Sequence, residues 1–84
     1  MIVIFAARHK FGEYYARYEL HLSPSEYRVT TRAESMHGLR PGAEVYFVVF
    51  APQYQMTLAE RREYNEARLV LNAHKVNYKL VYLP

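Results

Sequence analysis

Apolar and polar residues change their spacing several times along this chain, which is typical of alternating strands and helices. Residues 2–7 form an unbroken apolar run with β-branched side chains, as in a strand buried on both faces of a parallel sheet. In the next segment, apolar positions recur at intervals of four, three and four, which predicts an amphipathic helix over residues 10–21. These positions are Phe11, Tyr15, Tyr18 and Leu22.

The middle of the chain predicts a second strand, a brief helix and a third strand. Residues 27–31 are short and β-prone, and Arg28 suits a strand at the edge of a sheet. Thr31 and Glu34 have the spacing of a capping box, which predicts a short helix that ends at Gly38. Residues 43–51 give the strongest strand signal in the chain.

The last third of the sequence predicts a long helix and a closing strand. Thr57 and Glu60 form a second capping-box pattern, and a helix is expected over residues 58–74. Its expected apolar face comprises Tyr64, Ala67, Leu71 and His74, flanked by Leu58 and Val70. Residues 78–83 alternate between polar and apolar side chains, so we expect a strand at an edge or half-buried.

This order of elements predicts an α/β fold in a single domain over residues 1–84. Right-handed crossovers favour a small three-layer sandwich with a mostly parallel four-stranded sheet in the spatial order 2-1-3-4. The order of elements resembles a truncated Rossmann-like or flavodoxin-like domain, and this resemblance implies a Rossmann-like topology. Because many chemistries share that topology, the resemblance does not define a function.

Composition narrows the possible chemistry. The chain contains no cysteine, which excludes a thiol nucleophile and agrees with a cytoplasmic location. Its net charge is +3. It also contains no aspartate, so the usual magnesium ligand of phosphoryl-transfer enzymes is absent. Neither a GxGxxG turn nor a GxxxxGK[ST] loop occurs, and we therefore predict no cofactor. No apolar run approaches the ~18 residues that span a bilayer, and no signal peptide or membrane association is expected.

A candidate binding site lies where the predicted strands end. In open α/β sheets, ligands bind at the carboxyl ends of the strands, beside a switch point in strand order. Helix amino termini point to the same edge of the sheet, so we expect the ligand to be an anion or an acidic partner. The side chains that we place there are Arg8, His9, Lys10, Thr31, Arg32 and Tyr54.

The four histidines do not predict a metal site, because no two of them lie three to five residues apart. His74 is expected to have a structural role near the end of the long helix. Only His9 is a candidate for acid–base chemistry, and no nucleophile accompanies it. A minimal enzyme that uses His9, with Arg8 or Arg32 holding an anionic substrate, remains a hypothesis without support from a motif.

Nine tyrosines in a chain of this size suggest a contact surface. Some can be assigned to the core, and the others are difficult to bury together. The first set is Tyr15, Tyr18, Tyr46 and Tyr64, and the second is Tyr14, Tyr54, Tyr78 and Tyr82. The closing strand, which begins at Tyr78 and ends at Leu83, could also pair two copies into a homodimer or accept a strand from a partner.

These features favour a non-catalytic module that binds a macromolecular partner, with a protein as the first choice. In its compactness and lack of catalytic motifs, the chain is similar to the small accessory proteins encoded by bacteriophages, and a host-interaction role would follow from that likeness. The alternative is a nucleic-acid or nucleotide binder that uses the basic residues at the strand ends.

Overall fold

The four strands form one all-parallel sheet in the order β2-β1-β3-β4, which confirms the predicted fold class and strand order. The computed structural model describes residues 1–50 and 56–83. The strands are β1 (Ile2–Ala6), β2 (Tyr27–Thr30), β3 (Glu44–Phe50) and β4 (Lys79–Leu83). The helical elements are α1 (His9–Tyr14), the π-helical turn η1 (Tyr15–Glu19), the 3-10 helix η2 (Ala33–Met36) and α2 (Leu58–Ala73).

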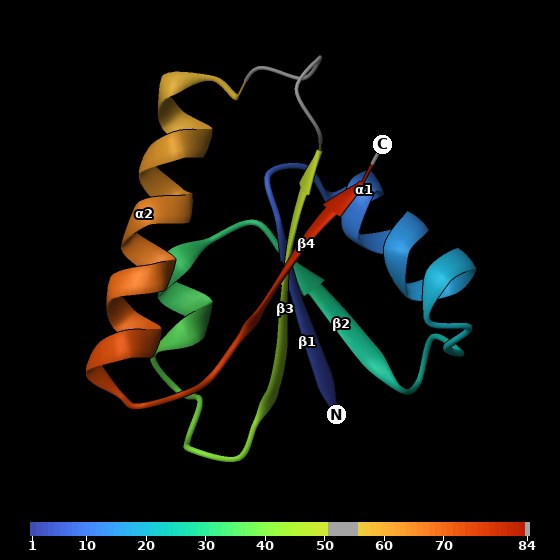
Figure 1. Cartoon of the computed structure of the whole chain (residues 1–84), viewed down its shortest axis with the longest axis horizontal. Coiled ribbons are helices and arrows are strands. Elements are labelled where there is room, and N and C mark those ends of the chain that lie inside the picture. The colour runs from blue at the N-terminus through green and yellow to red at the C-terminus, as the bar shows by residue number, and fades with distance from the viewer. Residues whose placement is uncertain (51–55, 84) are drawn as a thin grey trace.

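The sheet is the middle layer of three. Figure 1 shows α2 and η2 on one side of the sheet and α1 on the other, and we call these sides the α2 face and the α1 face. β1 pairs with β2 on one side and with β3 on the other. The chain therefore first passes from β1 to one side of the sheet and then crosses to the opposite side of β1 between β2 and β3. β2 and β4 are the edge strands, as expected from their mixed composition.

β1 is the central strand that its apolar run predicts. Val3 and Phe5 lie in the core on the α2 face, whereas Ile4 and Ala6 lie in the core on the α1 face. All four are at most 3 % exposed. Complete burial of a side chain as large as Ile or Phe contributes roughly 1.5–3 kcal/mol, so this strand anchors both layers.

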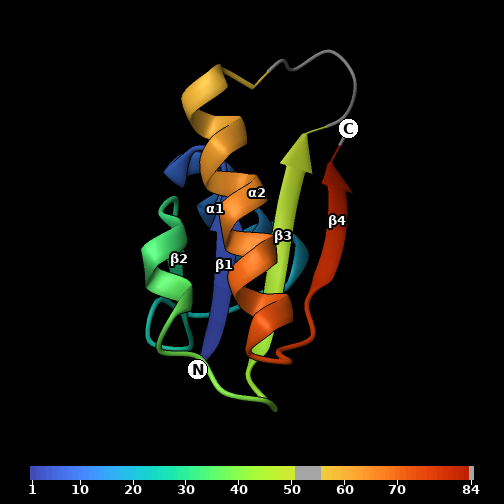
Figure 2. The ribbon, with the colours of Figure 1, turned by 90° about the vertical axis from the view of Figure 1, so that its left-hand side faces the viewer.

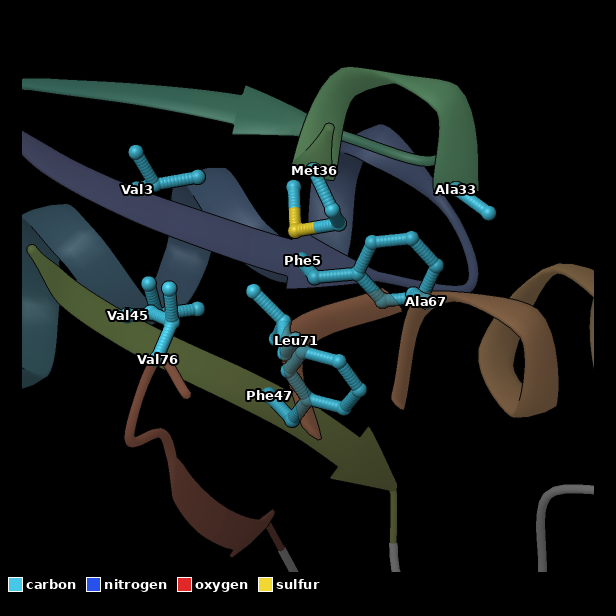
Figure 3. Close-up of a cluster of buried hydrophobic side chains, with 9 residues drawn as sticks. All are labelled: Val3, Phe5, Ala33, Met36, Val45, Phe47, Ala67, Leu71 and Val76. Carbon is cyan, nitrogen blue, oxygen red and sulfur yellow. The ribbon is translucent and has the colours of Figure 1, made fainter. Parts of the chain in front are cut away.

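The larger core lies on the α2 face (Figure 3). Phe5 and Phe47 stack with their ring centroids 4.9 Å apart, and Met36 and Leu71 cover them from η2 and α2. Ala67, one turn before Leu71, is fully buried, and its small side chain allows α2 to approach the sheet. The predicted apolar face of this helix is therefore correct at its centre.

The predicted face of α2 fails at its two ends. Leu58 is 67 % exposed and His74 is also exposed, because both lie beyond the part of the helix that crosses the core. The capping box at the start of α2 is confirmed: Glu60 N–H donates to Thr57 Oγ1, and Thr57 N–H donates to Glu60 Oε1.

The helix predicted over residues 10–21 is confirmed as a helical segment, but it ends at Glu19 and is not α-helical throughout. α1 ends at Tyr14, and the chain continues as a π-helical turn in which Leu20 N–H donates to the carbonyl of Tyr15. A π-helical turn holds more residues than an α-helical turn, so it shifts which positions face the sheet. Ala16 is fully buried as a result, whereas Tyr18, which was expected in the core, is 66 % exposed.

The capping box predicted at Thr31 is also absent. The residue that precedes η2 is Arg32, and its side chain makes no capping hydrogen bond. Instead, Glu63 of α2 accepts a hydrogen bond of 2.7 Å from the backbone N–H of Ala33. The backbone N–H of Ala33 at the start of η2 is thus paired by a residue distant in the sequence. The local spacing of Thr31 and Glu34 could not indicate this contact.

Candidate functional site

The carboxyl ends of β1 and β2 meet the first turns of α2. There they form a hollow of about 260 Å³ lined by Ala7, Thr31, Arg32, Ala59, Glu60 and Glu63. Thr31 and Arg32, which are consecutive in the sequence, both line this hollow, and Arg8 lies at the same edge through its contact with Glu60. The two glutamates were not part of the predicted site.

Both arginines at this edge are paired with a carboxylate. Arg8 Nε donates to Glu60 Oε2 at 3.0 Å, while the other oxygen of Glu60 completes the helix cap. Arg32 Nε lies 3.9 Å from Glu63 Oε1. The positive charge expected at the strand ends is therefore balanced locally, and an incoming anion would compete with two carboxylates that the fold already supplies.

His9 and Lys10 start α1 and do not line this hollow. The side chain of His9 is well exposed, with Nε2 3.8 Å from Glu13 Oε1. The ammonium of Lys10 lies 5.6 Å from the centroid of the Phe11 ring. Tyr54, the remaining residue of the predicted site, lies outside the described residues.

One pair of histidines comes together in a way that their spacing in the sequence does not indicate. His37, after η2, and His74, after α2, have ring centroids 6.0 Å apart. Both side chains are exposed. Within residues 1–50 and 56–83, no group of three or more histidine or glutamate side chains is positioned to hold a metal ion.

A second surface lies where α2 leaves the sheet uncovered. Figure 2 shows α2 in front of β1 and β3, with β4 outside it at the margin of the sheet. In the parallel register, Leu80 is opposite Phe47 and Tyr82 is opposite Val49. Because Phe47 belongs to the core on the α2 face, Leu80 and Tyr82 lie on that face too, and they are 41 % and 65 % exposed.

We call this surface the β4 margin and define it by Tyr64, Arg68, Tyr78, Leu80 and Tyr82. It is ordered by contacts to the core: the ring of Tyr78 stacks on Phe47 at 4.6 Å, and Tyr64 meets Phe47 edge-on at 5.3 Å. Arg68 Nε donates to the hydroxyl of Tyr78 at 3.1 Å, and its guanidinium lies 5.8 Å from the centroid of the Tyr64 ring. The arginine is thus held over aromatic rings at the surface.

These contacts also fix the charge of the β4 margin. The hydrogen bond from Arg68 to Tyr78 raises the pKa of the guanidinium above its ordinary value, so it remains positive at any physiological pH. Burial raises the pKa of the Tyr64 hydroxyl, although the nearby Arg68 charge acts in the opposite direction. The margin therefore presents the neutral hydroxyl of Tyr64 beside a permanent positive charge.

The charges of α2 are divided between its two flanks. Glu63 contacts Ala33 and Arg32 on the flank that faces η2. Arg68 faces β4 on the opposite flank, and Arg61, seven residues earlier, lies on the same side of the helix. In the described part of the chain, neither arginine forms an ion pair with a carboxylate.

The residues of the β4 margin were only partly found from the sequence. Tyr78 and Tyr82 were identified as difficult to bury, and the closing strand was recognised as an edge. Arg68 and Leu80 were missed. The seven-residue spacing of Arg61 and Arg68 on a predicted helix was a signal for a basic flank, but nothing local showed that this flank would face the closing strand.

The fold and its surfaces define a small all-parallel α/β protein of Rossmann-like topology. No protein-family model matches the chain, and neither a curated protein nor a solved structure matches it. No described helix is both long and apolar enough to cross a membrane.

Proposed function

We propose that this chain is a non-catalytic binding module that contacts a protein partner through the β4 margin. The observation that carries the proposal is the exposure of Leu80 and Tyr82 beside an ordered Arg68, along an edge strand. Tyrosine and arginine are enriched among residues that dominate binding energy at protein interfaces. The compactness of the chain and its lack of catalytic motifs, which are similar to those of small phage accessory proteins, suggest that this module acts as a phage-type accessory or host-interaction factor.

Physical arguments favour a protein over a phosphate-rich partner. Complete burial of a leucine side chain contributes at most roughly 1.5–3 kcal/mol, and a protein surface can cover the exposed parts of Leu80 and Tyr82. Nucleic acid or a nucleotide would instead need free cations at the carboxyl ends of the strands. There Arg8 and Arg32 lie beside Glu60 and Glu63, so part of the attraction for phosphate is already offset.

The proposal is tested by comparing three forms of the chain as bait in an extract of the source cells. The β4-margin variant is Leu80→Asp/Tyr82→Asp. The matched control is Leu58→Asp/Leu69→Asp, which introduces the same charge at two side chains that are 67 % and 68 % exposed on α2. Circular dichroism and thermal unfolding establish that each variant is folded.

We expect the wild type and the control to retain the same protein, and the β4-margin variant to lose it. Equal retention by all three folded forms would contradict the proposal. Titration with oligonucleotides at two salt concentrations separates the alternative, because saturable, salt-sensitive binding that depends on Arg8 and Arg32 would identify a nucleic-acid binder instead.

A further inference from the structure

The outer edge of β4 offers backbone groups for a further strand. Within the described residues, β4 pairs with β3 alone, so its other side presents N–H and C=O groups without a neighbouring strand. Natural edge strands are commonly protected by proline, by bulges or by several charges. The five residues of β4 contain no proline, their register with β3 is continuous, and Lys79 is the only charged side chain among them.

Positive charge lies on both faces of this edge. Lys79 is opposite Tyr46, whose side chain packs on the α1 face, so Lys79 lies on that face. Arg68 and the rest of the basic flank of α2 lie on the other face. Glu44, on the neighbouring strand, accepts a hydrogen bond of 2.6 Å from the Tyr46 hydroxyl, which raises the pKa of Tyr46 to about 12. In the described structure, the carboxylate of Glu44 forms no ion pair with Lys79.

We propose that β4 accepts an extended, acidic segment of the partner as a fifth strand of the sheet. The added strand would place apolar side chains against Leu80 and Tyr82, and carboxylates near Arg68 on one face and Lys79 on the other. The five residues of β4 span roughly 17 Å, so a segment of similar length suffices. This inference rests on the proposed function and specifies the chemistry of the partner.

Charge complementarity selects an acidic segment over a second copy of the chain. A two-fold pair of β4 strands would bring together two copies of Arg68 and two copies of Lys79, and none of the residues of β4 or of the β4 margin carries a carboxylate to oppose them. Like charges at such an interface oppose association. An acidic strand makes the same backbone hydrogen bonds and neutralises both side chains.

The test uses a displayed library of random nine-residue peptides, selected on the full chain and counter-selected on Leu80→Asp/Tyr82→Asp. The selected sequence is then synthesised with three variants: glutamine at its acidic positions, N-methylation of alternate backbone amides, and a scrambled order. Fluorescence anisotropy measures affinity, and amide chemical shifts of the chain locate the site.

We expect the selected peptides to carry acidic residues at both odd and even positions, so that carboxylates reach both faces of the added strand, together with apolar residues that face Leu80 and Tyr82. We expect the shifts to be concentrated at residues 79–83. Replacing the acids, or using Arg68→Gln, should weaken binding at least tenfold, and N-methylation should abolish it. Three results would overturn the inference: basic or uncharged selected sequences, no enrichment over the counter-selected variant, or binding that tolerates N-methylation. A concentration-dependent dimer in sedimentation that Leu80→Asp/Tyr82→Asp abolishes would likewise assign the edge to a second copy.

The two proposals can fail separately. If the β4-margin variant loses its protein in the extract but the selected peptides are basic or bind elsewhere, the margin is still a docking surface and the acidic strand is wrong. If the variant retains its protein, the docking surface itself is wrong.

Discussion

At the scale of single residues, Gly12 allows α1 to lie close against the sheet. A Cβ atom at this position would be 2.5 Å from Val29 Cγ1 and 3.3 Å from Ile4 Cγ2. Both contacts come from side chains of the sheet, one of them in the buried core, so the added methyl group cannot be accommodated without a shift. The packing distance between the layers therefore depends on the absence of a side chain here.

Overpacking costs about 1–3 kcal/mol, and alanine regains up to ~1 kcal/mol over glycine in a helix. Because the contact with Val29 is so short, we predict that Gly12→Ala destabilises the fold by a net amount of up to about 2 kcal/mol. Gly38→Ala is the control, because no atom lies within 4 Å of a Cβ built there. Urea unfolding measures both variants, and a Gly12→Ala protein as stable as the wild type would show that α1 does not pack at this distance.

The ionised carboxylate of Glu26 stabilises the folded state, and this stabilisation is lost at acid pH. Its carboxylate accepts hydrogen bonds from the backbone N–H and the hydroxyl of Ser23, and these bonds lower its pKa below the ordinary value of 4.5. Because the pKa is lowered in the folded state, the stabilisation is present above pH 4.5 and is lost as the pH falls through the folded pKa.

We therefore expect Glu26→Gln to be less stable than the wild type near neutral pH, and the difference to shrink as the pH falls below about 4.5. Urea unfolding between pH 3 and pH 7 measures this difference. A difference that is constant across this range would show that the carboxylate charge does not contribute.

At the scale of elements, α2 ends in a Schellman motif with an unfavourable residue at its turning point. Val76 N–H donates to the carbonyl of Leu71, and Lys75 N–H donates to that of Asn72. Lys75 adopts the left-handed conformation, with φ of 57°, at a position where glycine is usual. The side chains of Val76 and Leu71 lie together in the core, so this turn directs the chain from the helix toward β4.

Lys75→Gly is expected to stabilise the protein by about 0.5–1 kcal/mol. Relief of a left-handed conformation is worth about 1–2 kcal/mol, and the greater freedom of glycine in the unfolded chain offsets part of it. Lys75→Ala is the control, since alanine keeps the strain and removes the charge. If the glycine variant is no more stable than the alanine variant, the turn carries no conformational strain.

At the scale of the whole molecule, the periodicity of the chain was sufficient to predict the layers and the strand order. The apolar run of β1 reflects burial on two faces, which is a local property of that strand. In β4 only Val81 and Leu83, on the α1 face, pack into the core, and the apolar Leu80 is exposed. The π-helical turn at Tyr15 and the pairing of Arg8 with Glu60 were not predicted. The pairing depends on how the first turn of α2 meets the ends of the strands, and spacing along the chain does not encode that approach.

The difference between local patterns and contacts across the fold also explains how far the candidate surfaces could be predicted from the sequence. The basic residues at the strand ends could be named from the sequence, but their carboxylate partners come from α2, about 30 to 50 positions away. The β4 margin likewise combines the last strand with one flank of α2. Its exposure follows from the path of the helix over β1 and β3, which leaves the final strand uncovered (Figure 2).

Amide hydrogen exchange tests the central claim, that β4 is a docking edge, most directly. The exchange of the full chain is compared with and without the protein retained in the capture experiment. The account predicts that exchange slows within residues 79–83 when the partner is bound, because their outer N–H groups gain hydrogen bonds, and that β2, at the other edge, is unchanged. Slower exchange at the carboxyl ends of β1 and β2, with β4 unaffected, would contradict it.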